Sequence, residues 1–326
     1  MILVTGATGH IGNVLVRKLL ARGESVRVLA LPKEDCTSLE GLHLDCVWGD
    51  VLNLESLAAA CQGIRLVYHL AGLISIMPGL NEQVQRVNVD GTRNMILAAR
   101  QAGVRRLVYT SSIHAIARAP HGVQIDESIP YDPEHALSAY DRSKAQASLE
   151  VLRAVQEGLD AVLVCPTGVI GPQDYRRSEM GHIIFNSMRG KPQVSVDGAY
   201  DFVDVRDVAE GLILAAEKGR CGENYILSGE RLSLRQLVTL TQEFTGKQSY
   251  LLQLPMKLAQ ALAWFAPLYY RLSKSKPLFT PYALATVASN SNISSAKAQR
   301  ELGYRPRSLR ETIADAVTWF KGKNNE

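Results

Sequence analysis

The chain has 326 residues, of which 46% are hydrophobic and 21% are charged. This is the composition of a globular protein, and it excludes a disordered or collagen-like chain. The 36 basic and 32 acidic side chains give a net charge of +4 without a dense run of lysine and arginine, so we expect no nucleic-acid partner.

The five cysteines are scattered, and none belongs to a CxxC pair. We therefore expect reduced thiols in a cytoplasmic protein, without a metal site. The apolar run at residues 2–4 ends too early for a signal peptide, and no uncharged apolar stretch is long enough to span a membrane. The nearest candidate, residues 254–272, contains Lys257, Pro267 and Arg271. We interpret it as a helix over an apolar cavity, with a membrane-surface anchor as the alternative.

Short apolar runs alternate with helical patterns in the first half of the chain. The runs predict strands at residues 2–4, 26–30, 46–48, 66–70, 106–110 and 161–165. Apolar residues at three- and four-residue spacing predict helices at residues 11–21, 54–61, 82–101 and 139–156. Nearly continuous apolar strands are buried on both faces, which predicts an α/β fold with a Rossmann-type doubly wound parallel sheet.

After Pro166 the alternation weakens and helical patterns predominate. Strand-like runs lie at residues 193–196 and 224–227, and helical patterns lie at residues 205–217, 234–245, 256–265, 295–302 and 309–321. These patterns predict a smaller, mostly helical C-terminal substrate lobe. We assign residues 1–168 to a dinucleotide-binding domain, to which residues 200–228 return. The substrate lobe then comprises residues 169–199 and 229–326.

Three glycines follow the first predicted strand and open the first helix. Gly6 allows a tight turn, Gly9 lets the backbone approach a pyrophosphate, and Gly12 permits close packing of helix on strand. The N–H groups at the start of the helix then face an anion. We therefore predict a dinucleotide site with the cofactor-binding residues Gly6, Thr8, Gly9, His10, Ile11 and Gly12.

The end of the second predicted strand bears on the choice of cofactor. NAD-binding proteins usually carry an acidic residue there for the adenosine ribose, and neither Ala30 nor Leu31 is acidic. Lys33 lies within reach of a 2′-phosphate, which favours NADP. NAD remains the alternative because Glu34 and Asp35 follow.

Asp50 and Val51 end the third predicted strand. The Asp50 carboxylate can accept a hydrogen bond from the adenine amino group, while the backbone of Val51 donates one. The alternative is that Asp50 serves only a turn or caps a helix.

Tyr140 and Lys144 lie four residues apart in the predicted helix 139–156, so both project from one face of it, and Ser138 is placed to cap its start. A phenol with a pKa near about 10 is a poor acid or base at neutral pH. A neighbouring ammonium and the positive nicotinium both favour the phenolate. The spacing therefore predicts an acid/base pair, in which Lys144 can also hold the nicotinamide ribose.

Further polar residues accompany this pair. Ser112 follows the fifth predicted strand at the sheet edge where α/β proteins bind ligands, and its hydroxyl can polarise a carbonyl or simply cap the local backbone; Ser111 is its nearest rival. Asn88 interrupts an apolar helical pattern, where it holds either a proton-relay water or a structural hydrogen bond. His114 faces the substrate pocket or serves the core.

In this order, the motifs resemble the extended short-chain dehydrogenases/reductases of the NAD-dependent epimerase/dehydratase superfamily. The dihydroflavonol-reductase-like and 3β-hydroxysteroid-dehydrogenase-like branch is the most similar. The matching segments are residues 5–12, 49–50, 69–72, 88–92, 110–112, 140–144, 166–172, 202–209 and 294–306.

The resemblance implies roles for individual residues. Tyr140 would be the acid/base, Lys144 its partner, Ser112 the carbonyl polariser and Asn88 a supporting residue. The cofactor would also be lined by the segment that contains Leu70, Ala71 and Gly72 and by the backbone between Pro166 and Val169.

Two departures from the family pattern point away from a nucleotide-sugar substrate. Ile113 and His114 stand where dehydratases carry an Asp-Glu pair. Tyr200 stands where sugar epimerases place an arginine, and a phenol lacks the bidentate phosphate contact of a guanidinium. The aromatic run at residues 264–270 favours an apolar ligand instead, or belongs to the core.

We therefore expect an NAD(P)-dependent oxidoreductase that transfers a hydride between the nicotinamide and a carbonyl or secondary alcohol of a small, apolar substrate. One alternative is an NAD-dependent epimerase/dehydratase of a nucleotide sugar. Another is a non-catalytic, cofactor-sensing binding protein. By analogy with family members, we expect a homodimer through helices 82–101 and 139–156.

Overall fold

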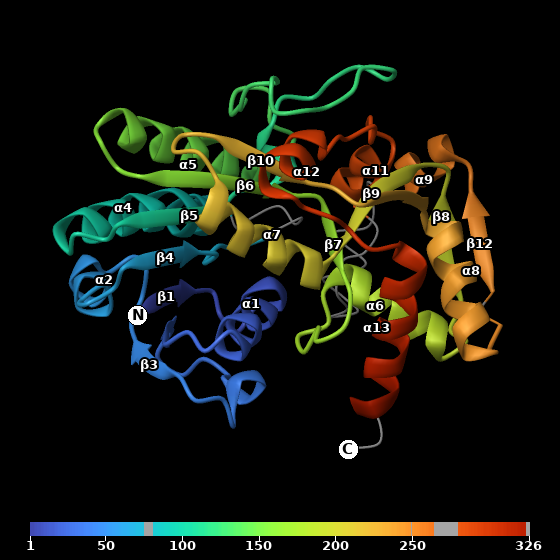
Figure 1. Ribbon diagram of the computed structural model, residues 1–326. Coiled ribbons are helices and arrows are strands. Elements are labelled where there is room, and N and C mark those ends of the chain that lie inside the picture. Colours follow the sequence, from blue (N-terminus) through green and yellow to red (C-terminus); the bar gives the residue numbers. More distant parts are fainter. Residues whose placement is uncertain (75–80, 249, 264–279, 324–326) are drawn as a thin grey trace.

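Seven parallel strands form the central sheet of the computed structural model, which describes residues 1–74, 81–248, 250–263 and 280–323 (Figure 1). Their order is β10-β6-β5-β4-β1-β2-β3. The strands are β1 Ile2–Thr5, β2 Val26–Ala30, β3 Asp45–Trp48, β4 Leu66–His69, β5 Arg106–Thr110, β6 Ala161–Pro166 and β10 Asn224–Leu227. The predicted doubly wound α/β fold is confirmed.

Helices cover both faces of this sheet (Figure 1). One face packs against α1 His10–Ala21, α7 Val205–Lys218 and α12 Ala296–Leu302. The other packs against α2 Leu54–Ala60, α4 Gly91–Gln101 and α5 Ala139–Gln156. In β1, Ile2 and Val4 enter the first core and Leu3 the second, which explains why the strand is apolar at every position.

The predicted helix 82–101 has three parts. It begins as α3 Asn81–Gln85, passes through a π-helical turn at Arg86–Asp90 and continues as α4. A π-helical turn closes i→i+5 hydrogen bonds and often marks a functional site. Here it contains Asn88, whose carbonyl accepts a hydrogen bond from the Thr92 hydroxyl at 2.6 Å.

The second part of the molecule contains more strands than predicted. It has a three-stranded sheet of β11 Glu230–Ser233, β9 Ala199–Asp204 and β7 Gly168–Ile170, and a pair of β8 Gln193–Val196 with β12 Leu251–Leu254. Its helices are α6 Glu179–Met188, α8 Leu234–Thr245, α9 Met256–Ala263, α11 Pro281–Val287 and α13 Leu309–Lys323. Of these five strands, only β8 was expected. The division into lobes stays a prediction.

The segment considered as a membrane anchor is described only in part. Within it, α9 buries Ala259 and Ala263 and exposes Leu258 and Leu262, while the aromatic run at 264–270 lies outside the described residues. Among the described residues, no helix is long and apolar enough to cross a membrane, and no group of three His, Cys, Asp or Glu side chains is placed to hold a metal.

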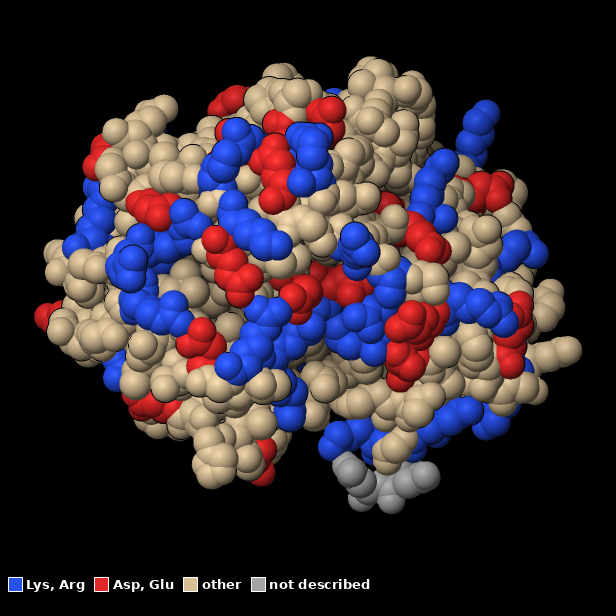
Figure 2. Space-filling model, viewed as in Figure 1, with Lys and Arg blue, Asp and Glu red and all other residues tan. Residues whose placement is uncertain are grey.

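Charges of both signs are mixed on the surface. Figure 2 shows basic and acidic side chains side by side across the middle of one face. Lys18 of α1 pairs with Glu210 of α7 at 2.9 Å, and Arg206 pairs with Asp315 of α13 at 2.6 Å. This face therefore presents no continuous basic surface.

Candidate active site

The glycine loop between β1 and α1 is shaped by contacts that only glycine allows. Gly6 has a φ of +72°, and a Cβ there would lie 2.8 Å from the backbone of Leu70 and Ala71. A Cβ at Gly12 would lie 2.1 Å from the Gly6 carbonyl oxygen. No side chain caps the start of α1 at Gly9, and its first turn carries no acidic residue, so its N–H groups are open to an anion. The loop fits the pyrophosphate of a dinucleotide.

The residues that follow β4, the strand next to β1, lie against this loop. The backbone N–H of Ala71 donates to the Thr5 hydroxyl at 3.1 Å, and Leu70 donates to the Thr5 carbonyl at 3.3 Å. Below them, the buried His69 ring is held between Thr5 and Thr92, and burial lowers its pKa to about 3. The predicted cofactor-lining residues Leu70 and Ala71 therefore lie directly beside Gly6.

Glu34, rather than Lys33, contacts the glycine loop. Its carboxylate accepts hydrogen bonds from the Thr8 hydroxyl at 2.5 Å and the Leu31 N–H at 2.9 Å, and pairs with Arg176 at 2.8 Å. Burial raises the pKa of Glu34, but these hydrogen bonds outweigh it, so the pKa is lowered and the group is ionised. Lys33 is exposed and has a left-handed backbone, with a φ of 69°.

Asp50 makes a turn contact, which was the alternative to a hydrogen bond with adenine. Its Oδ1 accepts a hydrogen bond from the Leu52 N–H at 2.9 Å. Val51 is buried, and its carbonyl accepts from Asn94 at 3.0 Å. Recognition of adenine by these two residues stays a prediction.

The segment after β6 also reaches the glycine loop. His10 donates from Nε2 to the Pro172 carbonyl at 2.9 Å, which ties the first turn of α1 to the chain beyond β7. A Cβ on Gly168 would lie 2.8 Å from the Phe202 ring, so β7 packs tightly on β9. Pro166 ends β6, and Val169 pairs with Val203.

Helix α5 begins as predicted. The Ser138 side chain caps it by accepting the Asp141 N–H at 3.0 Å. Lys144 and Ser143 are buried on the face that packs against the sheet, and Tyr140 is half-buried above them. This start fixes the rotation of the helix and therefore the direction of both Tyr140 and Lys144.

The Tyr140 phenol and the Ser112 hydroxyl lie together. Burial raises the pKa of Tyr140 to about 12, and a side-chain hydrogen bond with Ser112 opposes the increase. The Ser112 Oγ also accepts the His114 N–H at 3.2 Å, so it caps the 3-10 turn Ile113–Ala115 as well. The capping alternative for Ser112 is therefore a contact of this structure, and its role in polarising a carbonyl stays a prediction.

Lys144 faces the sheet instead of the phenol. Its ammonium donates to the Thr110 carbonyl at 2.5 Å and lies 4.6 Å from the centre of the Tyr109 ring. Burial lowers the pKa of Lys144 to about 8. The charge that would favour a phenolate is therefore directed at the end of β5 in this structure.

Asn88 joins two parts of the site. Its amide donates to the Leu73 carbonyl at 3.0 Å and to the Ser143 hydroxyl at 2.9 Å, and its Oδ1 accepts the Leu73 N–H at 2.7 Å. Ser143 in turn donates to the Tyr140 carbonyl at 2.8 Å. These bonds connect the loop after β4 to α5, which is the structural alternative considered for Asn88.

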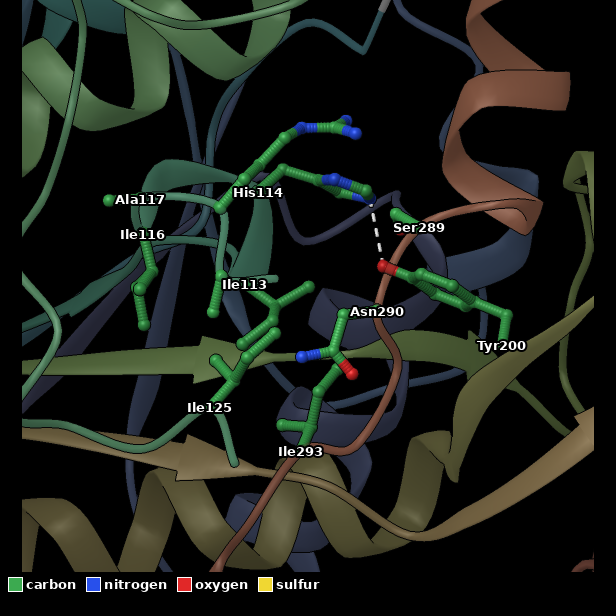
Figure 3. Close-up of a pocket in the computed structure, with 11 residues that line it drawn as sticks. Ile113, His114, Ile116, Ala117, Ile125, Tyr200, Ser289, Asn290 and Ile293 are labelled. Atoms are coloured by element: carbon green, nitrogen blue, oxygen red, sulfur yellow. Dashed lines mark hydrogen bonds between the residues drawn. The ribbon is translucent and has the colours of Figure 1, made fainter. Parts of the chain in front are cut away.

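Beyond Tyr140, aromatic side chains surround His114. The His114 ring stacks on Tyr200 with an interplanar angle of 7°, and its Nε2 lies 2.9 Å from the Tyr200 hydroxyl (Figure 3). The Tyr140 ring meets the edge of the His114 ring, with 6.5 Å between the ring centres. Burial lowers the pKa of His114, so the ring is neutral. Tyr282 of α11 donates to Asp141 at 2.6 Å.

Tyr282 and Arg176 were not found from the sequence. The Thr280–Pro281 pair is a recognisable helix start, but the partner of Tyr282 lies 141 positions away. Arg176 is one of two neighbouring arginines in an irregular segment. Nothing local indicates either contact.

The comparisons with known proteins agree with this geometry. Residues 2–228 match the family described as "NAD dependent epimerase/dehydratase family". Sterol demethylase protein B of Methylococcus capsulatus is 38% identical, over 98% of each chain. A 3-beta-hydroxysteroid dehydrogenase of Mycolicibacterium neoaurum is 31% identical, over 98% of this chain and 91% of the other. The crystal structure of gox2253 superposes with a TM-score of 0.87 at 34% identity, covering 99% of this chain and 98% of the other.

Proposed function

The chain belongs to the NAD dependent epimerase/dehydratase family, and from this premise we propose that it reduces a carbonyl, or oxidises the matching secondary alcohol, in a small apolar substrate. It is an NAD(P)-dependent oxidoreductase of the extended short-chain type. The observation that carries the finer proposal is the position of the Tyr140 phenol beside the Ser112 hydroxyl, at the carboxyl edge of the sheet. Two relatives named for sterol and steroid chemistry support an apolar substrate.

In this proposal Tyr140 moves the proton. A pKa of about 12 keeps its phenol protonated at neutral pH, so it is ready to donate to a carbonyl oxygen that becomes an alkoxide. Ser112 orients the same oxygen by a hydrogen bond, as an oxyanion donor does. A nicotinamide cofactor, when bound, would supply or accept the hydride. The protonated phenol suits the direction of reduction.

We assign Lys144 a positioning role in this chemistry. It holds the end of β5 through the Thr110 carbonyl, and it is placed on the same helix face as Tyr140 for the hydroxyls of the nicotinamide ribose. To stabilise the phenolate that remains after proton transfer, the ammonium has to turn from the Thr110 carbonyl towards Tyr140. Asn88 acts as a positioning residue through Ser143 and the Tyr140 carbonyl.

The position of Glu34 favours NAD over NADP, the reverse of the preference that Lys33 alone predicts. An ionised carboxylate on Thr8 can accept a hydrogen bond from a ribose hydroxyl and repels a 2′-phosphate. We expect Glu34→Gln to weaken NADH binding and strengthen NADPH binding, each by about fivefold. Titration of both nucleotides with the wild type and the variant measures the change. A wild type that binds NADPH more tightly than NADH contradicts this assignment.

The test of the proposed function is turnover. We expect the wild type to reduce apolar ketones with NADH or NADPH and to leave UDP-sugars unchanged, because Tyr200 is no diphosphate clamp. Tyr140→Phe should lower kcat by about 10²–10⁴-fold with little change in cofactor binding. If Tyr140→Phe keeps full activity, Tyr140 does not transfer the proton.

We also propose a homodimer through α4 and α5. Leu97 of α4 is 46% exposed and Leu149 of α5 is 39% exposed, although both helices otherwise pack well on the sheet. Light scattering should give twice the chain mass. Leu97→Glu together with Leu149→Glu should return it to that of one chain.

A further inference from the structure

The loop that follows β7, residues 171–178, lies beside α1 (Figure 1). The Pro172 carbonyl accepts a hydrogen bond from His10 at 2.9 Å, in the first turn of that helix. The Tyr175 hydroxyl accepts a hydrogen bond from Arg17 at 3.2 Å, two turns further along. A segment more than 150 positions away in the sequence is therefore held beside the helix whose first turn we assign to the pyrophosphate.

The backbone of this loop is held in place by buried contacts. Asp174 is 2% exposed, and its carboxylate accepts hydrogen bonds from the Ser178 N–H at 2.9 Å and the Ser178 hydroxyl at 2.7 Å. Tyr175 meets Trp319 edge to face, with 5.2 Å between the ring centres. A movement in this loop is therefore easiest at the side chain of Arg176, which is 54% exposed.

Arg176 covers the carboxylate of Glu34. Its guanidinium donates to Oε1 at 2.8 Å, and the same oxygen accepts the Thr8 hydroxyl at 2.5 Å, so the ion pair is joined directly to the glycine loop. The Glu34 side chain is only 19% exposed. Arg176 therefore lies on the solvent side of the carboxylate to which we assign the adenosine ribose.

Glu34 can accept a further hydrogen bond while it is paired with Arg176. A carboxylate offers about four acceptor positions. Among the described residues, three donors use them: Thr8 and Arg176 on Oε1, and the Leu31 N–H on Oε2. The position that remains on Oε2 can accept a ribose hydroxyl, so the ion pair is compatible with a bound adenosine.

We infer that the Arg176–Glu34 ion pair closes the adenosine end of the cofactor site and has to open before a nicotinamide dinucleotide enters or leaves. The inference rests on the place that the proposed function gives to Glu34. Arg176 is then a positioning residue, which acts through Glu34 and not through a contact with the cofactor. Because the ion pair forms with and without the cofactor, it slows association and dissociation by the same factor. It therefore sets the rate of cofactor exchange and leaves the affinity nearly unchanged.

The experiment measures the exchange of NADH on the full chain by stopped-flow fluorescence, with release started by excess NAD⁺. Arg176→Ala should raise the association and dissociation rate constants by about tenfold each and keep Kd within about threefold. Tenfold corresponds to about 1.4 kcal/mol, which lies between an exposed ion pair and a buried charged hydrogen bond. Arg177→Ala is the matched control, because this neighbouring guanidinium lies 4.0 Å from the centre of the Phe185 ring instead. Its rate constants should stay within about twofold of the wild type.

Two further variants connect the effect to Glu34. Arg176→Lys keeps the positive charge without the planar guanidinium, so its rate constants should lie between those of the wild type and Arg176→Ala. In the background of Glu34→Gln, adding Arg176→Ala should change neither rate constant by more than about twofold, because the ion pair is already lost. A further tenfold increase in that background would show that Arg176 acts through another contact, and it would overturn the inference.

The association rate constant decides between the possible roles of Arg176. A direct contact with the cofactor predicts faster release without faster association, and a contact with a 2′-phosphate predicts faster release of NADPH alone. Either result, slower association or unchanged rate constants in Arg176→Ala overturns the inference. Exchange of NADH requires no ketone, so it is measured independently of the proposed reaction. Faster exchange in a protein that reduces no ketone supports the role of the ion pair and contradicts the proposed reaction alone.

Discussion

The two sides of the active site are built from different materials. The side that we propose for the cofactor is formed by backbone. Peptide groups lie so close to Gly6 and Gly12 that a Cβ at either residue would collide with them. The side that we propose for the substrate is formed by side chains, such as those of His114 and Tyr200, which meet although they lie 86 positions apart. A backbone site tolerates almost no change of residue, whereas a side-chain site can change its chemistry one substitution at a time. Substrate preference can therefore drift while the cofactor site stays fixed.

We expect the largest effect from adding a methyl group to the glycine loop. We expect Gly12→Ala to weaken NADH binding by about 100-fold, which corresponds to about 3 kcal/mol, because its Cβ would meet the Gly6 carbonyl at 2.1 Å. Calorimetric titration measures the loss. Gly322→Ala is the control, since Gly322 lies in a helix and nothing lies within 4 Å of a Cβ there. Near-normal binding by Gly12→Ala would show that the loop is not held by this contact.

The pH dependence of kcat/KM tests the role of Lys144. Lys144 has a pKa lowered to about 8, so its ammonium is present below that pH and is lost as the pH rises above it. Tyr140 stays protonated up to about pH 12. If the ammonium is required, kcat/KM for reduction should fall about tenfold per unit above pH 8. Lys144→Arg should move this limb upwards, because a guanidinium keeps its charge. A flat profile to pH 10 would exclude this role.

The contact between the side chains of Tyr200 and His114 can be tested by substitution. Tyr200→Phe removes the donor to His114 Nε2, so the neutral ring loses a hydrogen bond that favours it. We expect the pKa of His114 to rise towards its ordinary value and kcat/KM for an apolar ketone to fall about fivefold. Heteronuclear NMR of the histidine ring measures the pKa. Tyr250→Phe removes the hydroxyl of a tyrosine that is 71% exposed, and serves as its comparison.

The smallest effect is expected at Tyr282. Its hydroxyl donates to Asp141 at 2.6 Å, yet Ser138 also donates to that carboxylate at 2.9 Å. Tyr282→Phe should therefore lower stability by only about 1 kcal/mol, or a few degrees in Tm, with kcat within twofold. Tyr250→Phe, at a residue that is 71% exposed, should change neither quantity.

The same contrast explains what the sequence could predict. The three glycines and the Tyr140–Lys144 spacing are local patterns, so the sheet, the loop and the start of α5 at Ser138 were expected correctly. The strand β7 has only three residues and gains its partner from β9. The salt bridge of Glu34 with Arg176 likewise depends on chain closure over 142 positions. Contacts between such distant segments leave no periodic pattern in the sequence, so they could not be predicted from it.

The order of the strands has a consequence for any attempt to shorten the protein. Strand β10 lies at the edge of the sheet beside β6, although the chain reaches it only after building β7, β8 and β9. A fragment that stopped at residue 168 would end with β6 as a bare edge, its peptide groups unpaired along one side. Such edges recruit strands from other molecules. We expect that fragment to aggregate, so the nucleotide-binding half cannot be excised as an independent unit.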